Sequence, residues 1–234
     1  MKKVMLVFGT RPEAIKMCPL VNELKSRSDD FEAVVCVTGQ HREMLDQVLD
    51  AFGVVPDHDL HVMRPGQTLF DVTCDVLLKM RAVLESEEPD AVLVHGDTTT
   101  SFAAAIACFY LRIPVGHVEA GLRTRDLYSP WPEEFNRQAV DVVSRWYFAP
   151  TEASRRNLEE GKPADRIWVT GNTGIDALRT TVREGYSHSV LDWAAGSRLV
   201  LITAHRRENL GAPMRSMFRA IRRVMEERPD VKVV

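Results

Sequence analysis

Short runs of apolar residues alternate along the chain with longer amphipathic segments. The apolar runs are typical of strands buried in a parallel sheet, and they lie at 4–8, 33–38, 91–95, 114–118, 146–149 and 166–170. Between them, apolar residues recur at helical spacing, as in the segments 40–52 and 68–88, the second of which ends before Pro89. This order predicts an α/β fold, a doubly wound, Rossmann-like parallel sheet with right-handed crossovers.

The pattern also predicts how the chain divides into domains. After a first domain at 1–172, the segment 173–197 begins as a helix and then loosens into Gly, Ser and Tyr. The alternation restarts at 198–234 with a strand, a helix and the beginning of another strand. Because so few elements cannot close a core of their own, we expect 173–197 to be an interdomain connection and 198–234 the start of a truncated second domain.

Composition and charge exclude several classes of protein. The 234 residues are 45% hydrophobic and 27% charged, with a formal net charge of −3, which is typical of a globular protein and favours neither a nucleic-acid nor a membrane partner. The four cysteines lie far apart, so we expect buried, reduced thiols in a cytoplasmic protein. His95 with Asp97, or His117 with Glu119, is the closest approach to a metal-ligand pattern, and we expect neither pair to hold a metal.

The stretch "VFGTRPEAIK" at 7–16 predicts a strand that runs into a helix. Thr10 and Glu13 have the spacing of a capping box, but Arg11 and Lys16 bring positive charge to the positive end of the helix dipole. The stretch is neither a G-x-G-x-x-G nor a Walker motif, so it indicates neither a tightly held dinucleotide nor a nucleoside triphosphatase. A pair of bases at a sheet edge fits instead an anionic group such as a diphosphate.

Charged side chains follow several predicted strands, where ligands of parallel sheets bind. The candidate carboxylates are Asp97, Glu119 and Glu133. For each there is a plainer interpretation: Asp97 fits a helix N-cap, and Glu133, like its neighbour Glu134, fits the acid-rich first turn of a helix. The bases that follow the strands, Arg123 among them, are on the same grounds ordinary surface charges. Only the gathering of these residues at one edge favours a site.

Five stretches, in order along the whole chain, closely resemble the non-hydrolysing UDP-N-acetylglucosamine 2-epimerases of bacteria: "FGTRPEAIKM", "VHGDTTT", "GHVEAGLRT", "YSPWPEEFNR" and "TAHRRENLG". The resemblance implies a glycosyltransferase-B-type architecture of two Rossmann-like domains, of which the second is incomplete here. It also implies a cytoplasmic homodimer, without metal or nicotinamide cofactor, that acts on UDP-N-acetylglucosamine and UDP. The reaction would convert UDP-N-acetylglucosamine to UDP-N-acetylmannosamine by eliminating UDP and adding it back with inversion at C2.

The resemblance also implies the roles of individual residues. It makes Asp97, Glu119 and Glu133 the catalytic carboxylates, and it assigns substrate binding to Arg11, Lys16, Arg137 and His205. Gln40 and His41 match a regulatory site of many bacterial members, although Gly66 stands where some of them carry arginine.

Three alternatives remain open from the sequence. A hydrolysing relative would release free N-acetylmannosamine, and the intact "SPWPEE" and "HRRENLG" stretches speak against it. A sugar-nucleotide binding module is a second alternative, because an incomplete chain can bind without turnover. A glycosyltransferase is the third, but transfer does not call for so many carboxylates at the strand ends.

Overall fold

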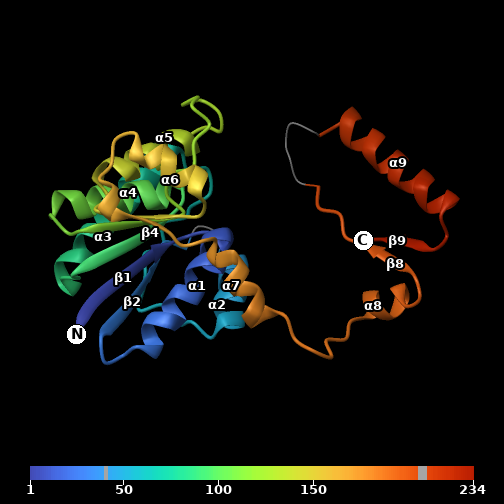
Figure 1. Ribbon diagram of the computed structural model, residues 1–234, viewed down its shortest axis with the longest axis horizontal. Coiled ribbons are helices and arrows are strands. Elements are labelled where there is room, and N and C mark those ends of the chain that lie inside the picture. The colour runs from blue at the N-terminus through green and yellow to red at the C-terminus, as the bar shows by residue number, and fades with distance from the viewer. Residues whose placement is uncertain (40–41, 205–209) are drawn as a thin grey trace. The chain divides into compact units, whose positions relative to one another are not determined.

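The computed structural model of the protein describes residues 1–39, 42–204 and 210–234. The chain divides into two compact units, Met1–Val182 and Arg183–Val234, and each is described by itself (Figure 1). Within the described residues, no helix has both the length and the apolar character that crossing a membrane requires.

Unit 1 is built on a seven-stranded sheet in the order β3-β2-β1-β4-β5-β6-β7, with every neighbouring pair parallel. Its strands are β1 (Lys2–Phe8), β2 (Phe31–Val37), β3 (His58–Asp59), β4 (Ala91–His95), β5 (Val115–Val118), β6 (Trp146–Ala149) and β7 (Ile167–Val169). On one side of the sheet β1 is followed outward by β2 and β3, and on the other side β4 is followed outward by β5, β6 and β7. The sheet therefore has a topological switch point between these two strands, where ligands of such folds bind.

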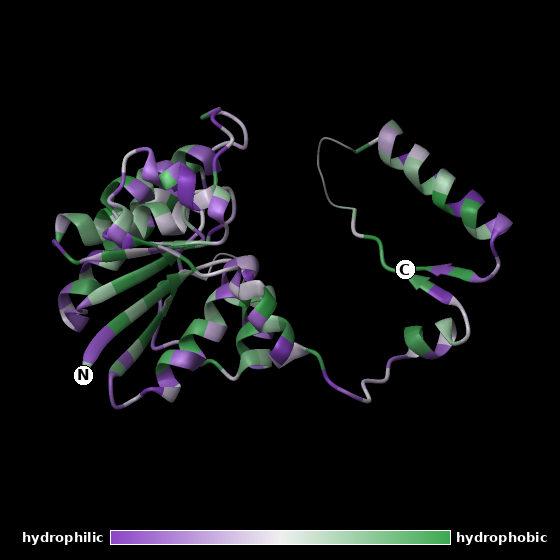
Figure 2. Cartoon of the chain, viewed as in Figure 1, coloured by the Kyte–Doolittle hydropathy of each residue, from purple (hydrophilic) through white to green (hydrophobic). Residues whose placement is uncertain are grey.

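Helices cover both faces of this sheet (Figure 1). One face carries α1 (Arg11–Ser26), α2 (Arg42–Phe52) and α7 (Thr173–Thr181); the other carries α3 (Leu69–Glu87), α4 (Thr99–Tyr110), α5 (Glu133–Val143) and α6 (Glu152–Glu159). Alternate residues of β1 face opposite ways, with Met5 in the core below α3 and α4 and Leu6 in the core below α1 and α2. Burial on both faces explains why the strands are apolar along most of their length (Figure 2).

The predicted α/β fold is confirmed, and the strands of the sheet lie where the apolar runs predicted them, with one exception. Strand β3 was not predicted, because its two half-buried residues, His58 and Asp59, form no apolar run. The predicted boundary at 172 also differs from the end of unit 1 at Val182. Helix α7 packs with α1, and its Ala177 lies in the same apolar cluster, so the structure includes α7 in unit 1.

Unit 2 contains α8 (Ser189–Ala194), β8 (Arg198–Val200), α9 (Ala212–Glu227) and β9 (Val231–Val233). Strand β8 is shorter than the predicted 198–204, because its partner β9 is itself only three residues long. Among the described residues of this unit only Ala194 is buried. The described residues that the sequence singles out for chemistry all lie in unit 1, and the candidate site is described from that unit.

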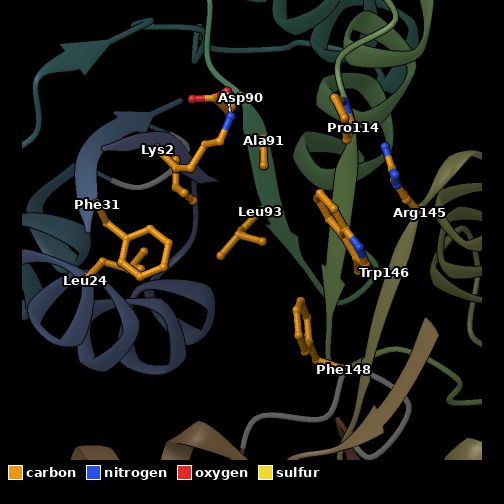
Figure 3. Close-up of a pocket in the computed structure, with 11 residues that line it drawn as sticks. Lys2, Leu24, Phe31, Asp90, Ala91, Leu93, Pro114, Arg145, Trp146 and Phe148 are labelled. Atoms are coloured by element: carbon orange, nitrogen blue, oxygen red, sulfur yellow. Dashed lines mark hydrogen bonds and ion pairs between the residues drawn. The ribbon is translucent and has the colours of Figure 1, made fainter. Parts of the chain in front are cut away.

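An apolar groove of about 510 Å³ opens at the amino ends of the strands (Figure 3). Leu93, Trp146 and Phe148 line it, and the ion pair between Lys2 Nζ and Asp90 Oδ1 (2.7 Å) lies at its edge. The side chains that sequence analysis singled out follow the carboxyl ends of the strands instead. The groove is thus not the place where the predicted chemistry gathers.

Candidate active site

The candidate site forms where the turns after β1, β4 and β5 meet. These strands are neighbours in the sheet, so their carboxyl ends lie side by side. The turn after β4 is tied to β5 by the Gly96 amide, which donates to the Val118 carbonyl (2.9 Å). Strand order thus brings Asp97 and Glu119 to one edge of the sheet, and α1 brings Lys16 to the same edge.

The start of α1 confirms the predicted capping box and shows a second use for it. Glu13 accepts from the backbone amides of Gly9 (3.0 Å) and Thr10 (2.7 Å), while its other oxygen accepts from the hydroxyl groups of Thr98 (2.7 Å) and Ser101 (3.1 Å). The buried Glu13 carboxylate therefore links the N-termini of α1 and α4. In dinucleotide-binding folds a pyrophosphate occupies such a helix start, and here a carboxylate of the protein does so.

Lys16 and His95 both contact Glu119. The ammonium of Lys16 donates to Oε2 of Glu119, and Nε2 of His95 lies 2.9 Å from the same oxygen. Only 16% of the Glu119 side chain is exposed. Burial by itself would raise the pKa of Glu119, but the contacts with His95 and Lys16 outweigh it and lower that pKa to about 2. Glu119 is therefore an anion throughout the neutral range.

Asp97 lies in the turn after β4 in a different electrostatic setting. Nη2 of Arg137 contacts its Oδ2 at 2.5 Å, and the Asn136 amide donates to its backbone carbonyl (2.9 Å). The pKa of Asp97 is raised, mainly because the carboxyl is desolvated. Arg137 opposes this shift, and the nearby charges of Glu133 and Glu119 add to it. Asp97 is not the N-cap of α4, because Thr98 holds that position and accepts from the Ser101 amide.

Glu133 and Glu134 begin α5 but lie in different surroundings. Glu133 is half-buried. Glu134 is fully buried and accepts from the backbone amides of Thr124 (3.0 Å) and Arg125 (3.3 Å) and from the side chain of Gln138 (2.8 Å). Glu134 therefore does more than complement the helix dipole, because it fastens the loop between β5 and α5.

Two buried side chains, those of His117 and Asp141, and the half-buried Arg123 form a triad beside the two turns. Nδ1 of His117 lies 2.6 Å from Oδ1 of Asp141, and Nε2 lies 2.7 Å from the carbonyl oxygen of Gly96. Nη2 of Arg123 donates to the other oxygen of Asp141 (2.6 Å). Burial alone would raise the pKa of Asp141, but His117 and Arg123 lower it. Since Gly96 precedes Asp97, the triad supports the turn that carries a candidate carboxylate, and Arg123 is not a free surface charge.

The structure thus brings together most of the predicted site residues that it describes. Lys16, Glu119, Asp97 and Arg137 form two adjoining ion pairs, and Glu133 is close enough to act on Asp97. Arg11 is exposed and forms no ion pair with any residue in the described part of the chain. His205, Gln40 and His41, predicted for substrate binding and regulation, lie outside the described residues.

Sequence reasoning missed the contact between His95 and Glu119. The sequence did offer the pairing of His95 with Asp97, but as a weak metal pattern. In the described part of the chain, no group of three or more His, Cys, Asp or Glu side chains is arranged to hold a metal ion. Three of the four cysteines are buried, as expected, but Cys74 is exposed, because it lies on the solvent side of α3.

Comparison with known proteins gives the same family that the motifs suggested. The family model for UDP-N-acetylglucosamine 2-epimerase matches residues 22–234. The Bacillus subtilis UDP-N-acetylglucosamine 2-epimerase is 58% identical over 233 residues, which make up 99% of this chain and 61% of that protein. The chain thus spans about three fifths of the length of this curated relative.

Two solved structures are also closely similar. A crystal structure of a putative UDP-N-acetylglucosamine 2-epimerase from Listeria monocytogenes superposes with a TM-score of 0.94 at 55% identity, covering 99% of this chain and 61% of that one. The Neisseria meningitidis UDP-GlcNAc 2-epimerase, solved with UDP-GlcNAc bound, gives a TM-score of 0.89 at 48% identity, covering 99% and 64%. The chain therefore belongs to the UDP-N-acetylglucosamine 2-epimerase family.

Proposed function

We propose that the protein interconverts UDP-N-acetylglucosamine and UDP-N-acetylmannosamine. The observation that carries this proposal is the meeting of two ion pairs, Lys16 with Glu119 and Arg137 with Asp97, at the carboxyl ends of β4 and β5. Family membership and the Neisseria relative with bound UDP-GlcNAc support the substrate. The resemblance further supports a cytoplasmic homodimer that needs neither metal nor nicotinamide.

The proposed reaction removes a hydrogen that is not acidic by itself. A carboxylate takes the proton at C2, the C–H electron pair becomes a C1–C2 double bond, and the C1–O pair leaves with UDP. UDP then adds to C1 of the neutral glycal while a proton returns to C2 from the opposite face. Inversion therefore needs proton acceptors and donors on both faces of the sugar, which a set of carboxylates supplies.

Asp97, Glu119 and Glu133 are the carboxylates proposed to act at this site, and the structure supports different roles for the first two. Asp97 has a raised pKa and so gains and loses a proton nearer to neutral pH than an ordinary aspartate. Glu119 keeps its negative charge and holds the ammonium of Lys16 at the site edge. Asp97 thus fits proton transfer, whereas Glu119 fits electrostatic support.

The cations have complementary proposed roles. Negative charge grows on the diphosphate as the C1–O bond breaks, so a preorganised cation stabilises the transition state more than the ground state. Lys16 and the exposed Arg11 are proposed to bind this diphosphate, together with His205. Arg137 is buried against Asp97 and is proposed to hold that carboxyl where the sugar binds.

Proton NMR in D₂O tests the proposal. UDP-N-acetylglucosamine is incubated with this chain and with a chimera, in which the chain is followed by the part of the Bacillus subtilis relative that lies beyond the match. Deuterium at C2 together with new mannosamine signals from the chimera is the expected result. Release of free N-acetylmannosamine would point to the hydrolysing reaction instead, and an unchanged spectrum from a chimera that binds UDP would leave only a binding module.

Matched variants link the activity to the site. Asp97→Asn removes the proposed proton carrier and should lower turnover at least about a hundredfold, in the range expected for loss of a general acid–base group. Asp90→Asn is the control, because Asp90 also flanks β4 but lies at its amino end, paired with Lys2. An equal loss of turnover in both variants would show that the activity does not depend on the carboxyl ends of the strands.

A further inference from the structure

Two nitrogen groups converge on a single oxygen of Glu119 from different elements. Lys16 reaches Oε2 from α1, and His95 reaches it from the last position of β4. His95 is 5% exposed, so its ring has little water to bind. Glu119 itself has a left-handed backbone conformation, with φ of 64°, which is strained in a residue with a Cβ. Contacts around this turn offset the strain, and those made by the Glu119 side chain are among them.

The Nε2 atom of His95 is buried without a well-aligned hydrogen-bond partner in the described part of the chain. Such an atom is costly unless a small movement gives it a partner. Oε2 of Glu119, 2.9 Å away, is an acceptor within reach. If the His95 ring donates to this oxygen alongside Lys16, the ionised form of the carboxylate is favoured.

We propose that His95 is a positioning residue for Glu119: together with Lys16 it holds the carboxylate as a fixed anion at the site edge. The proposal deepens the proposed function, on which its catalytic consequence rests. The titratable groups around Glu119 are Lys16, His95 and Asp97, and Arg137 and Glu133 act on Asp97. Loss of the His95 contact would free Glu119 to take up a proton, and Lys16 would lose the charge that holds it.

Unit 1 contains a matched control for this arrangement. Glu87 also contacts one histidine and one lysine, with Nε2 of His58 at 2.7 Å and Nζ of Lys3 at 3.1 Å. These two partners lie in β3 and at the amino end of β1, away from the turns after β4 and β5. The pKa of Glu87 is lowered by His58 first and by Lys3 second.

Carboxyl ¹³C NMR of the chain between pH 6 and pH 3 measures the contact without any need for activity. With a pKa of about 2, Glu119 is only about a tenth protonated at pH 3, so its resonance should move little in the unaltered chain. His95→Asn removes the group that reaches Oε2 and should raise the pKa by at least about one unit, which makes about half of Glu119 protonated at pH 3. His58→Asn should shift Glu87 and leave Glu119 unchanged.

A second variant separates positioning from general packing. In His95→Gln, the amide nitrogen occupies about the place of Nε2 and still donates, so the titration of Glu119 should return most of the way toward that of the unaltered chain. If Glu119 titrates identically in the unaltered chain, His95→Asn and His95→Gln, the proposal is wrong. If all His95 variants unfold while His58→Asn folds, His95 is a packing residue and the proposal also fails.

Steady-state kinetics of the chimera measure kcat, KM and their pH dependence, which would stay unchanged if His95 only filled space in the core. His95→Asn should lower kcat about tenfold or more, change KM less than about threefold and move the acid limb of the pH profile to higher pH. His95→Gln should recover most of kcat. If the titration of Glu119 shifts as expected in a chimera that does not epimerise, the proposed function fails while the positioning contact stands.

Discussion

Replacing Gly121 with alanine adds one methyl group to the turn that follows Glu119. Gly121 has φ of +86°, and a Cβ there would lie 2.3 Å from the carbonyl oxygen of Ser154 and 2.9 Å from Cγ of Leu158. Both residues belong to α6, and Leu158 is fully buried, so neither contact is relieved by a flexible surface side chain. The substitution therefore combines backbone strain with overpacking.

The cost of this substitution follows from these two terms. A left-handed conformation costs an alanine about 1–2 kcal/mol, and overpacking of a buried contact costs about 1–3 kcal/mol more. Gly53→Ala is the control, because Gly53 also has positive φ (+64°) but has nothing within 4 Å of the added Cβ. It should lose only the strain term, so Gly121→Ala should be the less stable variant by about 1–3 kcal/mol.

Urea unfolding followed by far-UV circular dichroism measures both losses. The midpoints are compared only where the two variants unfold with equal m-values, since a changed slope would signal a change beyond stability. If Gly121→Ala and Gly53→Ala lose the same free energy of unfolding, the turn after β5 does not pack against α6 as the structure indicates. The steric reasoning about the site edge would then be refuted.

Three further predictions concern the site and the thiols. Because the folded-state pKa of Glu119 is about 2 against an ordinary 4.5, its stabilisation is fully present above pH 4.5 and is lost as the pH falls toward 2. The free energy of unfolding in urea should fall between pH 6 and pH 3 by about 2 kcal/mol less in Glu119→Gln than in the unaltered chain. An equal fall in both proteins would contradict that pKa. Lys16→Met should reduce turnover of the chimera about a hundredfold or more, while the free energy of unfolding changes by less than about 2 kcal/mol. Normal turnover in this variant would refute the proposed role of Lys16 at the diphosphate. Ellman's reagent should react with the exposed Cys74 within minutes and should not react with Cys18, Cys36 and Cys108. These three thiols are buried, and burial raises their pKa values to about 12. Rapid reaction of all four cysteines would show that the core opens.

Much of the fold was predictable because its causes are local. Strands buried on both faces must be apolar along their length, and so the runs at 4–8 and 91–95 marked β1 and β4. The capping box of Thr10 and Glu13 depends on residues three positions apart, and it too was predicted. Strand β3 depends on pairing with β2 rather than on its own two residues, so no sequence pattern indicated it.

The candidate site shows a corresponding division. Asp97 and Glu119 could be predicted as site residues because they are acidic and follow strands, and ligands of parallel sheets bind at the carboxyl ends of the strands. The partners of these residues were not predictable in this way. His95 ends an apolar strand, and the sequence paired it with Asp97 rather than with Glu119, its partner in the structure. The support that Asp141 and His117 give to Gly96 joins three separate elements.

The sequence by itself determined how strands and helices alternate along the chain, where α1 begins and which side chains follow the strands. These features depend on residues a few positions apart. Only the tertiary structure decided which charges meet. Lys16 and Glu119 are 103 positions apart, and they are in contact because β1, β4 and β5 are adjacent in the sheet. The contacts that this adjacency creates with Lys16 and His95 overcome the effect of burial and make Glu119 a stable anion, whereas burial dominates at Asp97 and raises its pKa. Two carboxylates of similar ordinary acidity thereby acquire pKa values shifted in opposite directions.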